Sequence, residues 1–218
     1  MITVGIATLP SRGHVLFDTI ESIYDQVDKI IIGLNGHKTI PKILQRDKIE
    51  CHFLNNEKGD AAKFFKVPEE GFFFSMDDDL IYPKDYVKTT IKALKDHSVV
   101  SYHGRNFDYP IASYYKSAKE RYYCLEEVKK KVKVQVCGTG VTAFDCSKVK
   151  ITYDKFLLPN MADIWFSLEC KKQGHDIYVL PHKKGWIEYN KKMNNDTIYE
   201  HMKDKDQAQT LIMNECFK

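Results

Sequence analysis

Three consecutive aspartates at the end of an apolar run are the feature that most constrains how this chain can fold. Residues 71–76 are aromatic or apolar apart from a glycine and a serine, which predicts a buried strand. Asp77, Asp78 and Asp79 follow at once, and a helix is predicted to begin at Pro83, because proline is favoured in a first helical turn. A strand that leads through a short loop into a helix is the repeating unit of an α/β sheet.

The three carboxylates indicate a cation. Adjacent negative charges repel one another, and beside an apolar strand this repulsion is poorly screened. Oxygen ligands suit Mg²⁺ or Mn²⁺, and open α/β sheets bind ligands at the carboxyl ends of their strands. The alternative is a solvated acidic loop that caps the following helix. The buried strand favours a metal-dependent enzyme that acts on a phosphate-bearing substrate.

Composition excludes several classes of protein. A chain of 218 residues with 43% hydrophobic and 29% charged residues has room for one sizeable α/β domain. The net charge of +3 comes from lysines far more than from arginines, so nucleic acid is not an expected partner. The six cysteines form no Cys-x-x-Cys pair, which is typical of free thiols in a reducing compartment. With no predicted membrane span or signal peptide, a cytoplasmic protein is expected.

Hydrophobic patterning predicts alternating strands and helices. Strands are expected at residues 2–8, 29–34, 50–54, 71–76, 98–102 and 176–180, and helices at 15–26, 59–66, 83–96, 161–173 and 197–215. This alternation predicts a mostly parallel central sheet with helices on both faces. Residues 103–135 could be helix or long strands. Residues 134–144 alternate like a strand, and Gly138 and Gly140 within it indicate a bulge or a close backbone approach to a ligand.

With the aspartate triplet at a strand end about one third along it, the chain resembles the GT-A fold glycosyltransferases. These are nucleotide-sugar-dependent enzymes with one Rossmann-like domain and a single metal site. The resemblance implies one catalytic domain over residues 1–218, with a nucleotide-binding half at 1–102 and an acceptor- and sugar-binding half at 103–218. It implies that Asp77 and Asp79 hold Mn²⁺ or Mg²⁺, with Asp78 as a donor contact or as the alternative ligand if the register shifts by one.

The same resemblance implies further contacts to the donor. In the first half these are Thr8, Pro10, Arg12, Asn35, Asp60 and Lys63. In the second half His182 would be a third metal ligand, followed by Lys183, Lys184 and Gly185 on the diphosphate.

The resemblance also assigns residues to the transferred sugar and its acceptor. Asp163, at a predicted helix start, would be the catalytic base if the reaction inverts the anomeric centre, and would position the sugar if the reaction retains it. Trp165 would offer a stacking plane for a sugar, and Gly138 would allow a close approach of the substrate.

These residues predict metal-dependent transfer of a single sugar from a nucleoside-diphosphate sugar, UDP being favoured, to a hydroxyl group of a glycan or glycoprotein. The Gln-x-x-Arg-Trp helix of processive synthases is absent, which favours single additions. One alternative is a nucleotidyltransferase that makes a nucleotide-sugar, although the segment Ser11-Arg12-Gly13 is short for a triphosphate loop. Another is a non-catalytic carbohydrate-binding domain. The chain could also be one domain of a longer polypeptide, as in multi-domain glycosyltransferases of large DNA viruses.

Overall fold

The computed structural model describes residues 1–193 and 197–217, and a mixed eight-stranded sheet forms its centre. The strands are β1 (Ile2–Thr8), β2 (Lys29–Asn35), β3 (Ile49–Leu54), β4 (Phe72–Met76), β6 (Val99–Ser101), β9 (Val132–Val134), β11 (Val141–Asp145) and β12 (Ile177–Val179). Their order across the sheet is β3-β2-β1-β4-β11-β6-β12-β9.

Strand direction changes at β11. The pairs β3–β2, β2–β1, β1–β4 and β6–β12 are parallel, as the alternation of strands and helices predicted. β11 is antiparallel to both β4 and β6, and β9 is antiparallel to β12. Because β11 runs backwards, it begins at the edge of the sheet where β4 ends. The loop before β11 therefore lies next to the aspartate triplet.

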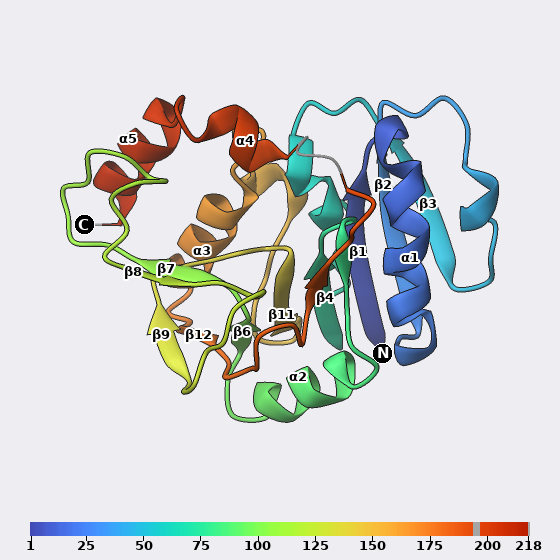
Figure 1. The fold of residues 1–218 in the computed structure, drawn as a ribbon, viewed down its shortest axis with the longest axis horizontal. Coiled ribbons are helices and arrows are strands. Elements are labelled where there is room, and N and C mark those ends of the chain that lie inside the picture. The colour runs from blue at the N-terminus through green and yellow to red at the C-terminus, as the bar shows by residue number, and fades with distance from the viewer. Residues whose placement is uncertain (194–196, 218) are drawn as a thin grey trace.

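Helices cover both faces of the sheet, which confirms the predicted α/β class. They are α1 (Gly13–Ile23), α2 (Tyr86–Leu94), α3 (Ala162–Lys172), α4 (Ile198–Met202) and α5 (Gln207–Cys216). Neighbouring side chains on a strand point to opposite faces. Phe73 packs in one core cluster with Phe166 of α3, whereas Phe74 packs in the other with Leu16 of α1. Figure 1 shows β1, β2, β3 and α1 on one side of the molecule and α3, α4 and α5 on the other.

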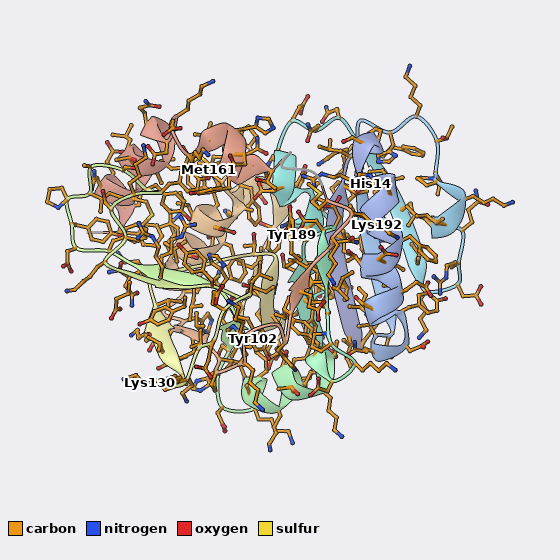
Figure 2. All side chains as sticks on the ribbon, in the orientation of Figure 1. His14, Tyr102, Lys130, Met161, Tyr189 and Lys192 are labelled. Carbon is orange, nitrogen blue, oxygen red and sulfur yellow. The ribbon has the colours of Figure 1, made fainter. Side chains whose placement is uncertain are left out.

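The second half is more irregular than the first. Three short strands, β7 (Gly104–Asn106), β8 (Glu120–Tyr122) and β10 (Val136–Cys137), form a small antiparallel sheet, so neither the helix nor the long strands considered for residues 103–135 are present there. β5 (Leu80–Ile81) pairs with β13 (Glu188–Tyr189). In Figure 2, Lys192 of the segment that follows lies beside α1, where its Nζ is 2.8 Å from Asp18 Oδ2.

Two predicted helices differ from the structure. Residues 59–66 form a 3₁₀ helix, Gly59–Phe64, rather than an α-helix. The single helix predicted for residues 197–215 is wrong, because α4 and α5 are separated near the buried Asp206. The Asp206 carboxylate accepts hydrogen bonds from Ser113 Oγ (2.6 Å) and the Tyr115 amide (2.9 Å), which fixes the chain at the break. In the part of the chain that the structure describes, the helices are too short or too polar to cross a bilayer.

Candidate active site

A cavity of about 490 Å³ opens at the carboxyl ends of β1, β2 and β4. Ten of the sixteen predicted site residues line it: Thr8, Arg12, Asn35, Asp60, Lys63, Asp77, Asp78, Asp79, Gly138 and Asp163. They come from both halves of the sequence, so the cavity is built across the sheet. Met161, which immediately precedes α3 and also lines the cavity, is labelled in Figure 2.

Asp78 ties the aspartate triplet to the neighbouring elements. Its Oδ2 accepts a hydrogen bond from Thr8 Oγ1 at the end of β1 (2.7 Å), and its backbone carbonyl accepts one from Thr19 Oγ1 in α1 (2.9 Å). Burial raises the pKa of Asp78 to about 6, against the opposing effect of the Thr8 hydrogen bond. The middle carboxylate of the triplet therefore has a structural partner in the sheet.

Asp77 and Asp79 contact basic side chains. Asp77 Oδ1 forms an ion pair with Lys63 Nζ, and Asp79 Oδ2 lies 3.4 Å from Arg12 Nη1. The Asp77 side chain is 44% exposed and that of Asp79 15% exposed, so Asp77 is the more accessible of the two. Burial, reinforced by repulsion from Asp77 and Asp78, raises the pKa of Asp79 to about 7.

Lys63 is a buried cation among several carboxylates. Its side chain is only 4% exposed. Burial alone would lower its pKa, but Asp77 and Asp60 outweigh that effect and raise the pKa above its ordinary value. Burial raises the pKa of Asp60 to about 7 even though Lys63 opposes the shift. The Oδ1 atom of Asp60 has no hydrogen-bond partner among the described residues, which leaves an acceptor available on the cavity wall.

The loop before β11 orients Asp163. The backbone amide and Oγ1 of Thr139 both donate to Asp163 Oδ1, each at 2.7 Å. Burial raises the pKa of Asp163, and the two Thr139 hydrogen bonds oppose that rise. Thr139 was not among the residues predicted from the sequence, although its place between Gly138 and Gly140 is a signal that marks it. Both glycines lie close to other side chains of the protein. A Cβ atom at Gly138 would lie 2.9 Å from His103, and one at Gly140 would lie against Asp77.

Four residues that the sequence analysis did not predict form what we call the outer half of the cavity: Arg105, Tyr114, Tyr115 and Gln209. The Arg105 guanidinium carbon lies 5.0 Å from the Tyr114 ring centroid and 5.4 Å from that of Tyr115. Arg105 Nη1 and both polar side-chain atoms of Gln209 are buried without a hydrogen-bond partner among the described residues. No short motif marks these positions, because Gln209 lies far along the sequence from Arg105, Tyr114 and Tyr115.

The other six predicted residues, Pro10, Trp165, His182, Lys183, Lys184 and Gly185, do not line the cavity. Pro10 begins a 3₁₀ helix (Pro10–Arg12), and it is Arg12 at the end of this helix, not Pro10, that lines the cavity. Lys183, Lys184 and Gly185 are exposed on another part of the surface, where Lys184 Nζ lies 3.0 Å from Glu126 Oε2.

Trp165 and His182 are packed into the protein. Trp165 lies in the same core cluster as Phe166, 7% exposed. Because two residues correspond to about 200° around a helix, Trp165 points away from the cavity that Asp163 lines. The ring nitrogens of His182 lie 2.9 Å from the Leu180 carbonyl and 3.2 Å from that of Tyr123. The structure therefore gives these two side chains neighbours other than the predicted sugar and metal.

The oxygen ligands that line the cavity fit a divalent cation whose remaining ligands would come from water and from a substrate. Among the described residues, no three His, Cys, Asp or Glu side chains form a ready-made metal cage. Mg²⁺ sites commonly use only one or two carboxylates, completed by water and substrate phosphates. The cavity is lined by five carboxylates against three lysine or arginine side chains, so an added cation would reduce repulsion. Asp77 and Asp79 are the carboxylates of the triplet that could hold it.

Comparison with known proteins gives a distant likeness in structure only. No family model matches this sequence, and no curated protein does. Among solved structures, the chain is similar to a galactosyltransferase, LgtC, whose structure was determined in complex with donor and acceptor sugar analogs. The TM-score is 0.41 at 12% sequence identity, over 80% of this chain and 65% of that one. A likeness of this size does not identify a family.

Proposed function

We propose that this chain is a metal-dependent glycosyltransferase of the GT-A type. It would transfer a single sugar from a nucleoside-diphosphate sugar to a hydroxyl group of a glycan or glycoprotein. The observation that carries the proposal is the convergence of Asp77 and Asp79, from the loop after β4, with Asp163 from α3 in one cavity, with the buried Lys63 among them. A carboxylate cluster at a strand end suits a cation and a diphosphate, and a separate carboxylate suits work on the acceptor.

The residues divide into two groups by their chemistry. Asp77 and Asp79 would hold Mn²⁺ or Mg²⁺, which when bound would act as a Lewis acid that offsets the charge on the leaving diphosphate. Lys63 and Arg12 add fixed positive charges close to the triplet. Such preorganised charges stabilise a negative charge that develops during a reaction.

Asp163 is proposed to act on the acceptor. In an inverting reaction its carboxylate would take the proton of the acceptor hydroxyl, and its raised pKa makes it a stronger base than an exposed aspartate. In a retaining reaction it would position the transferred sugar. Thr139 fixes Asp163 Oδ1 in either case.

The nucleotide is proposed to lie over the first half of the chain. Thr8, Asn35 and Asp60 line this part of the cavity, at and beyond the ends of β1 and β2. The Asn35 amide donates to the Gly59 carbonyl (2.9 Å), and its Oδ1 is buried without a partner among the described residues. An unpaired buried acceptor suits a donor group on a base or ribose. We favour UDP as the nucleotide.

A thermal-shift screen tests this proposal. UDP, GDP, CMP and dTDP are each added with and without Mn²⁺. We expect a rise in melting temperature only when one nucleoside diphosphate and the metal are present together, because each completes the site of the other. Transfer from the matching sugar nucleotide to a panel of glycans then tests the reaction. If no nucleotide shifts the melting temperature with or without metal, the transferase proposal falls and a non-catalytic carbohydrate-binding domain takes its place.

A further inference from the structure

The outer half of the cavity holds polar groups that lack partners. Gln209 of α5 is 1% exposed, and both its Oε1 and Nε2 are unpaired among the described residues. Arg105 Nη1 is buried and unpaired in the same way. Buried polar groups in folded proteins are nearly always hydrogen-bonded, so unpaired ones on a cavity wall need partners that a bound ligand or water must supply.

The chemistry of these groups suits a sugar. A carboxamide presents a donor and an acceptor side by side, which matches two adjacent hydroxyl groups. Arg105 lies over the rings of Tyr114 and Tyr115, and Tyr199 of α4 packs against Tyr115 with ring centroids 5.4 Å apart. Aromatic side chains bring apolar faces to a site and carry a polar tip, and carbohydrate has the same mixture of C–H faces and hydroxyl edges.

The charge balance of the cavity disfavours an anionic ligand in this half. Five carboxylates and three basic side chains line the cavity, and the donor would bring a diphosphate as well. Burial acts to lower the pKa of Arg105, but Tyr114 and Asp163 outweigh that effect and raise it, so part of the arginine charge is already balanced from within the protein. A further carboxylate or phosphate would add repulsion in a site with little water to screen it.

We propose that Arg105 and Gln209 form a subsite for an uncharged sugar with two adjacent hydroxyl groups. The Gln209 carboxamide bonds both hydroxyls, and Arg105 donates to one of them. The identity of this sugar as the acceptor of transfer rests on the proposed function. Binding of the sugar itself does not, because the subsite is defined by groups outside the aspartate triplet.

Saturation-transfer difference NMR tests the subsite with simple probes. Methyl pyranosides of glucose, galactose, xylose and rhamnose represent uncharged sugars, and glucuronate and glucose 1-phosphate represent the two kinds of anionic sugar. The variant is Gln209→Leu, which keeps the size of the side chain. Gln207→Leu is the matched control, because Gln207 is exposed on the same helix. Arg105→Gln provides a second variant that does not alter α5.

We expect at least one uncharged glycoside to give a signal, and Gln209→Leu to weaken its affinity roughly tenfold, about the contribution of one or two hydrogen bonds. Gln207→Leu should bind as the wild type does. The melting temperature of Gln209→Leu should equal or exceed that of the wild type, because the change removes an unpaired buried amide. Arg105→Gln should weaken the same glycoside.

The proposal is overturned if only glucuronate or glucose 1-phosphate gives a signal, if no sugar gives one, or if Gln209→Leu binds like the wild type. UDP binding with Mg²⁺ is measured on the same samples by calorimetry. Loss of UDP binding in Gln209→Leu would also contradict the proposal, since it would place Gln209 in the nucleotide site. Glycoside binding without any UDP binding would support the subsite while contradicting the transferase function.

Discussion

The carboxylate of Asp77 occupies the space that a side chain at residue 140 would need. A Cβ atom built on Gly140 would lie 2.0 Å from Asp77 Oδ2, far inside van der Waals contact. The Gly140 carbonyl also accepts hydrogen bonds from Tyr82 Oη (2.6 Å) and from the Asp77 amide (3.3 Å), so the backbone has little freedom to retreat. Glycine at position 140 therefore sets where the first carboxylate of the triplet lies.

Gly140→Ala should displace the Asp77 carboxylate and weaken metal-linked nucleotide binding by roughly tenfold or more, which corresponds to about 1.4 kcal/mol. Calorimetric titration with UDP and Mn²⁺ measures the effect. Gly13→Ala is the matched control, because a Cβ there meets no atom within 4 Å. Equal affinity of the two variants would show that the position of Asp77 does not matter to the ligand.

Asp79→Ala should abolish transfer and metal-linked binding while leaving the fold intact. Asp79 is repelled by Asp77 and Asp78, so loss of its carboxylate removes repulsion and should not lower the melting temperature at pH 8. Its backbone carbonyl still accepts from the Asn190 amide (2.8 Å). Asp96→Ala, at an exposed position, serves as the control. Turnover at the wild-type rate in Asp79→Ala, with metal present, would contradict the assignment of the triplet.

Lys63→Met should destabilise the protein, since it leaves buried carboxylates without their cation. Breaking a buried charge pair costs about 3–5 kcal/mol. The loss should be smaller at pH 5 than at pH 8, because Asp60 takes up a proton with a pKa of about 7. Urea unfolding at both pH values measures it, with the exposed Lys88→Met of α2 expected to change stability by less than about 0.5 kcal/mol. A loss that does not depend on pH would argue against carboxylate repulsion as its cause.

Stability without metal should fall as the pH rises from about 4 to 7. Burial raises the pKa of Asp60 and Asp79 to about 7 and that of Asp78 to about 6, from the ordinary value of 3.8 for an aspartate. In this interval the folded state therefore binds more protons than the unfolded state, and each step up in pH favours unfolding. Added Mn²⁺ should reverse the trend above pH 7, because it binds the deprotonated carboxylates. Melting temperatures from pH 4 to 8, with and without Mn²⁺, check both statements.

Thr139→Val should shift the acid limb of the kcat/KM profile to higher pH. The two Thr139 hydrogen bonds lower the pKa of Asp163 against the effect of burial, and valine removes the one from Oγ1. The Asp163 pKa should rise, so a base at that position loses its proton at a higher pH. Thr39→Val, at an exposed position, is the control. A profile that falls in height without moving would indicate that Asp163 positions the sugar rather than accepting a proton.

The first half of the fold was predictable because its signals are local. The apolar runs that form β1, β2 and β4 are continuous in the sequence. The polar residues at the ends of these runs predict where the cavity lies. The aspartate triplet could be predicted as part of the site without knowledge of distant contacts, since the strand before it and the turn after it are adjacent in sequence. The α/β class follows from the same local alternation, and the structure confirms it.

The outer half was not predictable because it depends on distant segments. Arg105 and Gln209 lie on opposite sides of Asp163 in the sequence and have no motif of their own. His182 failed to reach the cavity because the backbone at its position pairs with Val128, which directs the ring to the carbonyls of Leu180 and Tyr123. The break between α4 and α5 was missed for the same reason, since it depends on contacts of Asp206 about 90 residues away.

The arrangement of the site depends on the register in which the antiparallel strand β11 pairs with β4. Thr142 is paired with Ser75 and Val141 with Met76, and Ser75 Oγ donates to the Thr139 carbonyl at 2.5 Å. A slip of β11 by two residues would keep every side chain on its own face of the sheet. It would nonetheless move Gly140 away from Asp77 and Thr139 away from Asp163. Such a slipped form would be folded and inactive, so selection for activity in this chain is also selection against a misaligned competitor.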